Sequence, residues 1–370
     1  MADDGKTTTN DTTTYHSTGK VISKTADFMR KYQVVIYKHT TKSKNGVKYP
    51  NSNETVEQFT RAQTTDKVLD VSQLRCVFDI KRYAMYYPNS ATIQIYNLTA
   101  GTETDIMNEG YRVIVYAGYE KSATDTNYGQ IFDGDILMCS REKQNGTDYI
   151  LTILAMDGSF MYQEGYANFT LDRGATARDV VKNIVNKASV KIDAQDKNIS
   201  KVLEKKKYSK SKTVHGLVRN TLNDICKELN CTWFIDNGKL YILSYAEDSS
   251  YLPNGKAAIE LNVKTGLLGN VKQVNQGVEA KCLLNPQIVP FSMVRIESYL
   301  ITRQLPTIGT YSQGTSLTYK VDSKGLYRVI SVNHHGDTRG NDWYTYITAY
   351  TQSAGIPELL TSSGDSMGGD

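Results

Sequence analysis

The stretch 91-ATIQIYNLTAGTETDIMNEGYRVIVYAGY-119, followed by 129-GQIFDGDI-136, decides the fold class. Its first segment alternates, with Ile93 and Ile95 on one face, as in a strand that is buried on one side only. Residues 102–109 are predicted to form a short helix, because acidic residues suit its first turn and Gly110 suits its end. A second strand pattern follows at 111–119. The stretch therefore predicts strand, helix and strand within an antiparallel β structure.

Strand patterns continue on both sides of this stretch, at 32–38, 74–81, 130–142 and 147–156. The last two meet at Gln144-Asn145-Gly146, and an Asn-Gly pair favours a tight hairpin because both residues tolerate positive φ. Residues 28–165 are therefore predicted to form a closed or nearly closed antiparallel barrel with one small helix. The polar residues 1–27 are expected to form an arm that is disordered or orders only on assembly, and residues 40–66 a long loop.

Residues 166–250 show helical periodicity and are predicted to form a small α+β insert. The segment 172–189 carries one apolar stripe, and Thr176 with Asp179 resembles a capping box. A second stripe predicts a helix over 214–230, followed by a hairpin that turns at Asp236-Asn237-Gly238 between strands 231–235 and 239–245. The stripe of the first helix consists of Ala177, Val180, Val181, Ile184, Val185 and Ala188, and that of the second of Leu217, Val218, Leu222, Ile225, Cys226 and Leu229.

Strand periodicity returns in residues 251–355, with patterns at 267–276, 277–284, 293–301, 325–336 and 342–351. These patterns predict a second barrel, interrupted by a Gly/Ser/Thr-rich loop near 306–317, and a flexible tail at 356–370. The predicted fold class is thus mainly β with an α+β insert: two β-barrel, tube-like domains that flank a small helix–hairpin domain.

The composition limits the function classes. Among 370 residues, 43 Lys and Arg stand against 39 Asp and Glu, a formal charge of +4, which excludes an electrostatically driven nucleic-acid binder as the first interpretation. No apolar run approaches the roughly 20 residues that cross a bilayer, and the first residues show no secretory signal. We therefore expect a soluble protein made in a cytoplasm. With 26 Tyr against 8 Phe, extensive protein contact surface is expected.

Motifs for catalysis or cofactor binding are not found in the sequence. His334 and His335 are adjacent on a predicted strand, so their side chains point to opposite faces and cannot share a metal ion without a bulge. Asp133-Gly134-Asp135 is interpreted as a loop or bulge between strands, and nothing marks a catalytic carboxylate pair. The five cysteines lack metal or redox spacing and are expected to be buried free thiols. No catalytic, cofactor-binding or metal-binding residue is assigned, and no enzyme is expected.

Two segments are candidate interfaces. The block 201-KVLEKKKYSKSK-212 contains Lys205, Lys206 and Lys207. One interpretation is a basic finger that contacts nucleic acid or an acidic protein partner. The favoured interpretation is a solvated linker within the insert. In 342-DWYTYITAYT-351, the alternating set that begins at Trp343 is predicted to face the interior of the C-terminal barrel. The opposite set, Tyr344, Tyr346 and Tyr350, is predicted to face a neighbouring domain or subunit.

Three stretches in this order resemble the central hub family of phage tail baseplates, of the late control protein D-like, contractile-tail hub type. The first carries Asn97-Leu98, Ala117-Gly118-Tyr119 and a Gly-x-Ile-Phe-x-Gly pattern at 129–134. The second is a T-A-x-D-V-V helix at 176–181 with the segment 233–242 after it. The third, 325–350, has a His-Gly-Asp turn and a Trp-x-Thr strand. Together the three stretches extend over about residues 30–355.

The resemblance implies a structural role in the virion. Hubs of this family are homotrimers in which two tube-like barrels per chain form a pseudo-sixfold ring, which adapts the hexameric tail tube to the trimeric spike. The implied partners are the tail tube protein, the central spike protein and neighbouring wedge or LysM-type baseplate proteins, with incidental contact to DNA or the tape measure protein in the lumen. The protein is then expected in the virion tail baseplate after synthesis in the host bacterial cytoplasm, with no cofactor.

Two alternatives from other classes stay open. One is a tail-associated cell-wall hydrolase, and the other is a distal-tail or carbohydrate-binding adaptor of a non-contractile phage. The sequence shows no long C-terminal extension of the kind that some family members carry, so we expect no appended hydrolase or receptor-binding domain.

Overall fold

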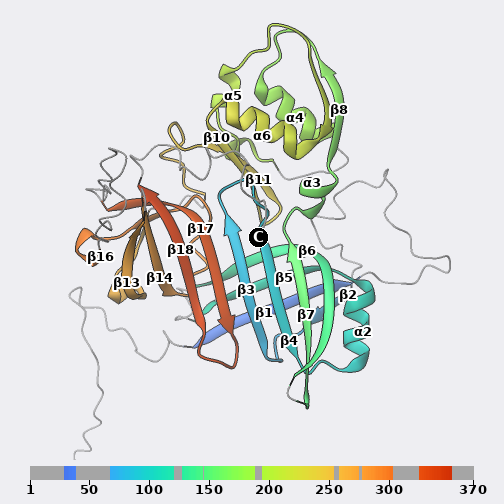
Figure 1. Cartoon of the computed structure of the whole chain (residues 1–370), viewed down its shortest axis with the longest axis vertical. Helices are drawn as coiled ribbons and strands as arrows, with labels where there is room; N and C mark the ends of the chain where they lie inside the picture. Colours follow the sequence, from blue (N-terminus) through green and yellow to red (C-terminus); the bar gives the residue numbers. More distant parts are fainter. Residues whose placement is uncertain are drawn as a thin grey trace, which may run out of the picture.

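The computed structural model describes residues 29–38, 67–120, 127–144, 146–187, 194–253, 258–274, 277–302 and 325–351. Within them the chain is mainly β, and most of the helices gather at one end of the molecule (Figure 1). The predictions for the arm 1–27, the loops 40–66 and 306–317 and the tail 356–370 lie outside the described residues. No helix of the described part is long and apolar enough to span a membrane.

One 14-stranded sheet holds most of the described strands. Its order is β16-β13-β14-β18-β17-β3-β4-β7-β6-β5-β1-β2, with the short β12 and β15 attached beside β17. The strands are β1 (Arg30–Lys38), β2 (Lys67–Asp70), β3 (Cys76–Tyr83), β4 (Ser90–Tyr96), β5 (Gly110–Tyr119), β6 (Asn127–Gln144), β7 (Asp148–Met156), β12 (Ile259–Glu260), β13 (Leu267–Val274), β14 (Gly277–Leu283), β15 (Met293–Arg295), β16 (Ile301–Thr302), β17 (Leu326–Asp337) and β18 (Trp343–Thr351).

The remaining elements are two small sheets and several helices. One small sheet pairs β8 with β9, and the other pairs β10 with β11. Their bounds are β8 (Tyr166–Leu171), β9 (Lys212–Leu217), β10 (Cys231–Asp236) and β11 (Lys239–Ser244). The helices are α2 (Ala100–Glu109), α3 (Ser159–Gln163), α4 (Ala177–Lys187), α5 (Val202–Lys205) and α6 (Val218–Glu228), with 3-10 turns η2 (Asp196–Asn198), η3 (Val263–Thr265) and η4 (Ser298–Leu300).

The N-terminal and C-terminal strands meet where β3 pairs with β17. The two strands are antiparallel, and His334 lies opposite Ile80. The two predicted barrels are thus parts of one continuous sheet. The pairing order is a path with two ends, and no closed barrel is found among the described strands. The coarser prediction, a mainly β chain with a helix–hairpin insert, is confirmed.

Each part of the fold buries its own apolar cluster. In the N-terminal part, β1 and β5 cross β3, β4 and β7 (Figure 1), and side chains such as Ile36, Ile80 and Val115 fill the space between them. A second cluster, which includes Val278, Val329 and Ile347, lies in the C-terminal strands. The insert has a third cluster around its helices. The strands of the main sheet therefore line two separate apolar cores, and the insert has a core of its own.

The helix predicted at 102–109 forms as α2; its end before Gly110 is as predicted, and its start lies two residues earlier, at Ala100. The helix begins after Thr99, whose hydroxyl accepts a hydrogen bond from the Thr102 amide, and it ends at Gly110. The hairpin β6–β7 forms as predicted, with Gly146 at a φ of 81°, while Asn145 lies outside the described residues. The Thr99 side chain thus caps the start of the helix. At its end glycine is favoured by space, because a Cβ on Gly110 would lie 2.6 Å from the Ile106 carbonyl oxygen.

The prediction for Asp133-Gly134-Asp135 is wrong, because these residues lie inside strand β6. The Arg112 guanidinium donates two hydrogen bonds of 2.6 Å to the Asp133 carboxylate. Asp135 accepts a bond of 2.8 Å from the Ser159 hydroxyl, and burial raises the pKa of Asp135. Gly134 is required by space, since a Cβ there would lie 2.6 Å from the Phe132 ring. These two carboxylates are tolerated inside a strand because Arg112 on β5 and Ser159 on α3 donate hydrogen bonds to them.

In the insert, the capping box is confirmed and one helix boundary is wrong. The Asp179 carboxylate accepts a bond of 2.8 Å from the Thr176 amide, and the Thr176 hydroxyl accepts one of 3.2 Å from the Asp179 amide. The predicted second helix begins only at Val218, because residues 212–217 form β9 and pair with β8. The hairpin β10–β11 turns at Asn237 and Gly238, which have φ values of 51° and 72°.

The cysteines are free thiols in the structure, as predicted. Cys76, Cys226 and Cys282 are buried, while Cys139 and Cys231 are partly buried. Burial raises the pKa of the Cys76 and Cys282 thiols to about 12, so both stay protonated and unreactive at neutral pH.

Candidate assembly surfaces and the junction with the insert

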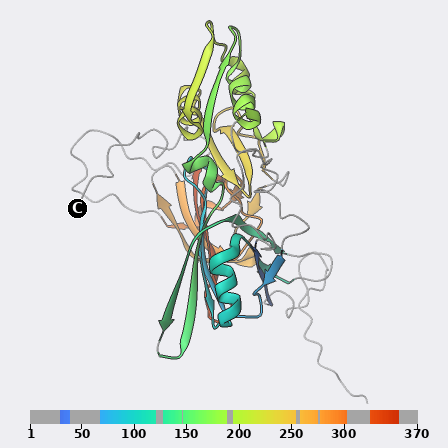
Figure 2. The same cartoon turned by 90° about the vertical axis from the view of Figure 1, so that its right-hand side faces the viewer.

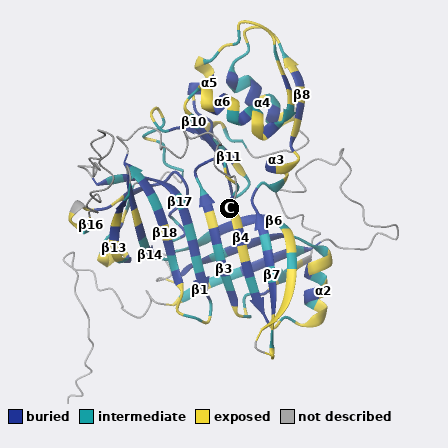
Figure 3. Cartoon of the chain, viewed as in Figure 1, coloured by how far each residue is buried: buried dark blue, intermediate teal, exposed yellow. Residues whose placement is uncertain are grey.

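The alternation predicted for β18 is present. Trp343, Thr345, Ile347 and Ala349 are buried, while Tyr346 is 43% exposed and Tyr344 and Tyr350 are half-buried. Figure 3 shows this mixture of buried and partly exposed residues along the strand. The core into which Trp343 packs differs from the predicted one, which was the interior of the C-terminal barrel. Its ring packs in the N-terminal cluster, whereas Ile347 and Ala349 pack in the C-terminal one, so a single strand contributes to both cores.

The partly exposed side of β18 forms a patch of Tyr344, Tyr346, Lys281 and His335, named here the tyrosine patch. The Lys281 ammonium lies 3.7 Å from the centre of the Tyr344 ring and 5.2 Å from that of Tyr346. The His335 ring stacks on Tyr344 at 5.3 Å. Desolvation is the main cause that raises the pKa of Tyr344 to about 12. The patch therefore offers aromatic area, hydroxyl groups and a cation, the combination that favours protein contact.

The two histidines point to opposite faces of β17, as predicted. His334 is fully buried, and its Nδ1 lies 2.9 Å from the Thr345 hydroxyl. Burial, with a smaller contribution from Arg82, lowers the pKa of His334 well below its ordinary value, so its ring is neutral. His335 lies on the other face, 3.8 Å from Asp79 and 3.7 Å from Asp342. Within the described ranges, no three side chains of metal-binding type come together.

The three candidate lysines of the insert have different surroundings. The Lys205 ammonium pairs with Glu247 at 2.6 Å, and Lys206 pairs with Glu228. Lys207 is exposed, and it has no ion pair among the described residues. The segment is also not a simple linker, because it contains α5, whose Val202 and Leu203 are buried. The block thus belongs to the insert's own fold, with part of its charge neutralised internally.

A buried ion pair fixes the insert to the main sheet. The Arg82 guanidinium on β3 donates bonds of 2.9 and 2.6 Å to the Asp236 carboxylate at the end of β10. Asn89 donates to the same carboxylate at 3.0 Å and to the Ile235 carbonyl at 2.9 Å. The Gly238 amide donates to Asp157 at 3.1 Å. Burial, and then the nearby Asp236, raises the pKa of Asp157 well above its ordinary value.

A second buried arginine holds the end of the insert. Arg328 on β17 donates to the backbone carbonyls of Ser249, Tyr251 and Phe291, with bonds of 2.7 Å to Tyr251 and 2.9 Å to Phe291. Desolvation lowers the pKa of Arg328 to about 10. Two adjacent strands of the main sheet, β3 and β17, therefore each supply one arginine that anchors the insert.

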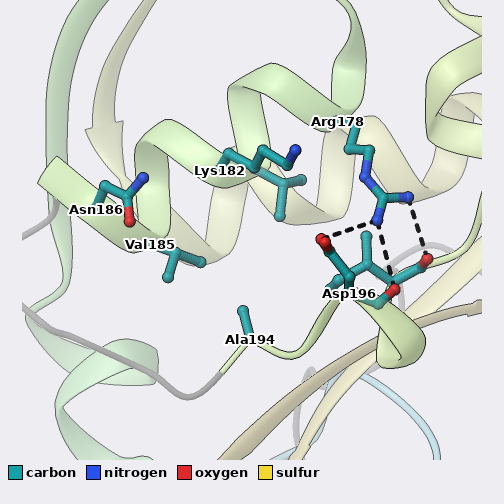
Figure 4. A pocket seen from close by; sticks show the side chains of 8 residues that line it. Arg178, Lys182, Val185, Asn186, Ala194 and Asp196 are labelled. Atoms are coloured by element: carbon teal, nitrogen blue, oxygen red, sulfur yellow. Dashed lines mark hydrogen bonds and ion pairs between the residues drawn. The ribbon is translucent and has the colours of Figure 1, made fainter.

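The insert contains a cavity of about 320 Å³. Arg178 lies at one side of it, where its guanidinium pairs with the Asp196 carboxylate at 3.0 Å (Figure 4). The same guanidinium also pairs with Glu204 at 3.1 Å. The lining residues are Arg178, Val181, Lys182, Val185, Asn186, Ala194, Asp196 and Ile199. The Arg178 guanidinium already pairs with two carboxylates of the insert, which neutralise its charge.

Comparison with protein families decides the identity. The family model described as Baseplate hub gp41 matches residues 55–325. The chain belongs to this baseplate hub family. It is therefore a structural protein of the phage tail baseplate, and the resemblance found in the sequence is confirmed. The match includes the junction residues Arg82, Asp236 and Asn89.

Several solved structures are similar to this baseplate hub protein at low sequence identity. The prophage MuSo2 43 kDa tail protein from Shewanella oneidensis is 7% identical, with 86% of this chain and 98% of that chain covered at a TM-score of 0.49. A tail protein from Neisseria meningitidis is 9% identical, with 74% and 91% covered at 0.45. The Escherichia coli c3393 protein, described as a component of the type VI secretion system, is 10% identical, with 77% and 76% covered at 0.45. No curated protein sequence matches significantly.

The junction arginines of this hub protein were missed in the sequence, although a signal for one of them was present. In β3, the residues Cys76, Phe78, Ile80 and Arg82 alternate onto the same buried face. A charged residue in register with a core face indicates a buried partner elsewhere in the chain. The identity of that partner depends on tertiary structure, so the sequence could have indicated Arg82 but not Asp236.

Proposed function

We propose that this chain is the central hub of its baseplate, a ring that adapts the hexameric tail tube to the trimeric spike. Three copies form the ring, and each contributes two β units. The role is mechanical, so it requires contact surfaces and symmetry and no catalytic residue. Membership of the baseplate hub family supports a position in the tail.

The observation that carries the proposal is the pair of β units within one chain. Each unit has its own apolar cluster, and the two are joined edge to edge where β3 pairs with β17. Three copies of a chain with two such units present six units around an axis, which suits a sixfold tube on one side and a threefold spike on the other. The proposed domains are residues 28–165 and 251–355 for the two tube-like units and 166–250 for the insert.

The contact surfaces follow from this arrangement. The tyrosine patch, together with Tyr350 on the same strand, contacts a neighbouring domain or subunit of the ring. The insert lies at one end of the molecule, beyond the main sheet (Figure 2), and contacts neighbouring baseplate proteins. The tail tube protein and the spike bind the two ends of the ring.

Electron microscopy of purified tails tests the proposal. Three copies of this chain in one ring, with two β units each facing the tube, are the expected result. A ring with two or six copies contradicts the proposal. Zymography of the purified chain on host cell walls is the complementary test, because a lytic band from this chain alone would show that it is an enzyme.

A further inference from the structure

The insert carries the positive charge of the whole protein. Residues 166–250 contain 15 Lys and Arg and 10 Asp and Glu, whereas the rest of the chain contains 28 and 29. The insert therefore has a formal charge of +5, and the remainder has −1. Since the sheet is close to neutral, any electrostatic attraction of an acidic partner is directed to the insert.

Several cations of the insert lie together at one end of it, named here the basic tip and formed by residues 172–175 and 206–212. β8 ends at Leu171 and β9 begins at its register partner Lys212, so both segments of the tip continue from the same end of this ribbon. Figure 1 shows this end of β8 farthest from the main sheet. The tip is thus the part of the insert that other proteins reach first.

Backbone hydrogen bonds tie the two segments of the tip together. The Gly174 amide donates to the Tyr208 carbonyl at 2.9 Å, and the Tyr208 amide donates to the Ala175 carbonyl at 2.9 Å. The Ala177 amide donates to the Lys206 carbonyl at 3.0 Å. The Tyr208 ring has the Lys212 ammonium 5.3 Å from its centre. The charges of the tip therefore sit on a fixed framework, which lowers the entropy lost on binding.

Some cations in and next to the tip are paired with glutamates, and others are not. Lys205 and Lys206 have glutamate partners in the insert. Arg173, Lys207 and Lys210 are exposed, and none of them has an ion pair within the part of the chain that the structure describes. Three exposed cations thus remain available on the tip, beside the exposed Asp172 and the half-buried Lys212, whose ammonium lies near the Tyr208 ring.

We infer that the basic tip is the attachment surface through which the insert binds an acidic face of a neighbouring tail protein. This inference rests on the proposed hub function. The exposed Asp172 beside Arg173 favours a protein partner, because a carboxylate repels nucleic-acid phosphates but can pair with a cation of a protein surface. The near-neutral charge of the rest of the chain gives no continuous basic track of the kind that nucleic acid requires.

Charge reversal of the three exposed unpaired cations tests the inference. The tip variant combines Arg173→Glu, Lys207→Glu and Lys210→Glu in the full chain. The control variant combines Lys264→Glu, Lys272→Glu and Arg295→Glu, which are exposed residues of the C-terminal part and give the same change in formal charge. Binding of labelled poly-L-glutamate and of a 20-base-pair DNA duplex is measured at low and at moderate salt. If the tip variant fails to fold, a variant with serine at the same three positions replaces it.

The wild type and the control variant are expected to bind poly-L-glutamate equally and more weakly as salt rises, with at least a tenfold loss in the tip variant. Equal binding by both variants, or no binding by the wild type, overturns the inference. Tighter binding of the duplex than of poly-L-glutamate at the same salt shows that the partner is nucleic acid instead. The copy number in purified tails is measured separately, so an incorrect tip assignment and an incorrect hub assignment give different results.

Discussion

Trp343 packs edge to face against Phe78, with the ring centres 5.4 Å apart and the ring planes at 70°. Phe78 lies on β3 and Trp343 begins β18, the last described strand. The indole N–H also donates to the Gly118 carbonyl at 3.3 Å, and Tyr32 packs against the ring at 6.1 Å. The last described strand therefore completes the core formed by the N-terminal strands.

Replacing Trp343 by alanine should destabilise the isolated chain by about 3–5 kcal/mol, as expected when a large aromatic side chain is removed from a core. Trp343→Phe keeps an aromatic ring against Phe78 and should cost less. Urea unfolding followed by circular dichroism measures both. An unchanged unfolding midpoint for Trp343→Ala would show that the ring does not support this core.

Tyr346→Ala and Tyr350→Ala should mainly weaken assembly. Tyr346 is 43% exposed, so its removal leaves no large cavity in the isolated chain, while it takes away contact area at the proposed interface. The melting temperature of the purified chain should stay close to that of the wild type, and incorporation into tails should fall. Unfolding of the isolated chain with normal incorporation would show that the two faces of β18 have been assigned the wrong way round.

Arg82→Ala should cost about 3–5 kcal/mol, because it leaves the buried Asp236 carboxylate without its cation. The double variant Arg82→Met, Asp236→Leu removes both charges and should recover part of this loss. Lys31→Ala provides the matched control, since its pair with Glu120 is exposed and such pairs contribute about 0–1 kcal/mol. Chemical unfolding gives the three values, and hydrogen exchange in β10–β11 reports the junction itself. Equal costs for Arg82→Ala and Lys31→Ala would contradict the anchoring role.

Asp157→Asn should change how stability depends on pH. Burial, and then the nearby Asp236, holds the pKa of Asp157 in the folded chain well above its ordinary value, so the native state binds the proton more tightly than the unfolded state does. The free energy of unfolding of the wild type therefore falls as the pH rises from about 4 through the raised pKa. The asparagine variant lacks this loss and should gain stability relative to the wild type between pH 4 and pH 8. Parallel pH profiles from urea unfolding would contradict the burial of a titrating carboxyl group.

Replacing Lys205, Lys206 and Lys207 together by serine should leave the central ring intact, because all three residues belong to the insert. Attachment of neighbouring baseplate proteins should weaken, and Lys207→Ser alone should account for most of that change, since Lys205 and Lys206 are paired with glutamates. Electron microscopy of tails made with each variant measures both effects. A ring that fails to form would show that the insert takes part in the ring contacts.

Local sequence patterns correctly predict those structural features that depend on contacts between residues close together in the sequence. The end of α2 before Gly110 and the Thr176–Asp179 cap follow from residues next to the backbone concerned, and the alternation of β18 follows from its own pattern. The start of α2 lies two residues before the predicted one, at Ala100. The predicted start of α6 is too early, because Val214, Leu217 and Val218 follow the i, i+3, i+4 spacing of a helix. That Val214 and Leu217 lie in β9 depends on pairing with β8, which lies far away in the sequence.

The features that sequence patterns could not supply all depend on long-range contacts. The patterns predict that Trp343 is buried, but only the pairing of β3 with β17 determines which core receives it. The same pairing places Arg82 near the insert. The two units were predicted as separate barrels because alternation reports which face of a strand is buried and does not report which strand lies beside it.

The pairing of β3 with β17 also sets the order in which the chain can finish folding during synthesis. β17 leaves the ribosome after the N-terminal strands and the whole insert, so the edge of β3 has no partner until then. An open strand edge can pair with other chains, and a contact between such distant segments forms slowly. Translation that stops before Leu326 is therefore expected to yield a fragment that aggregates. The edge of β3 is covered only after β17 has been synthesised.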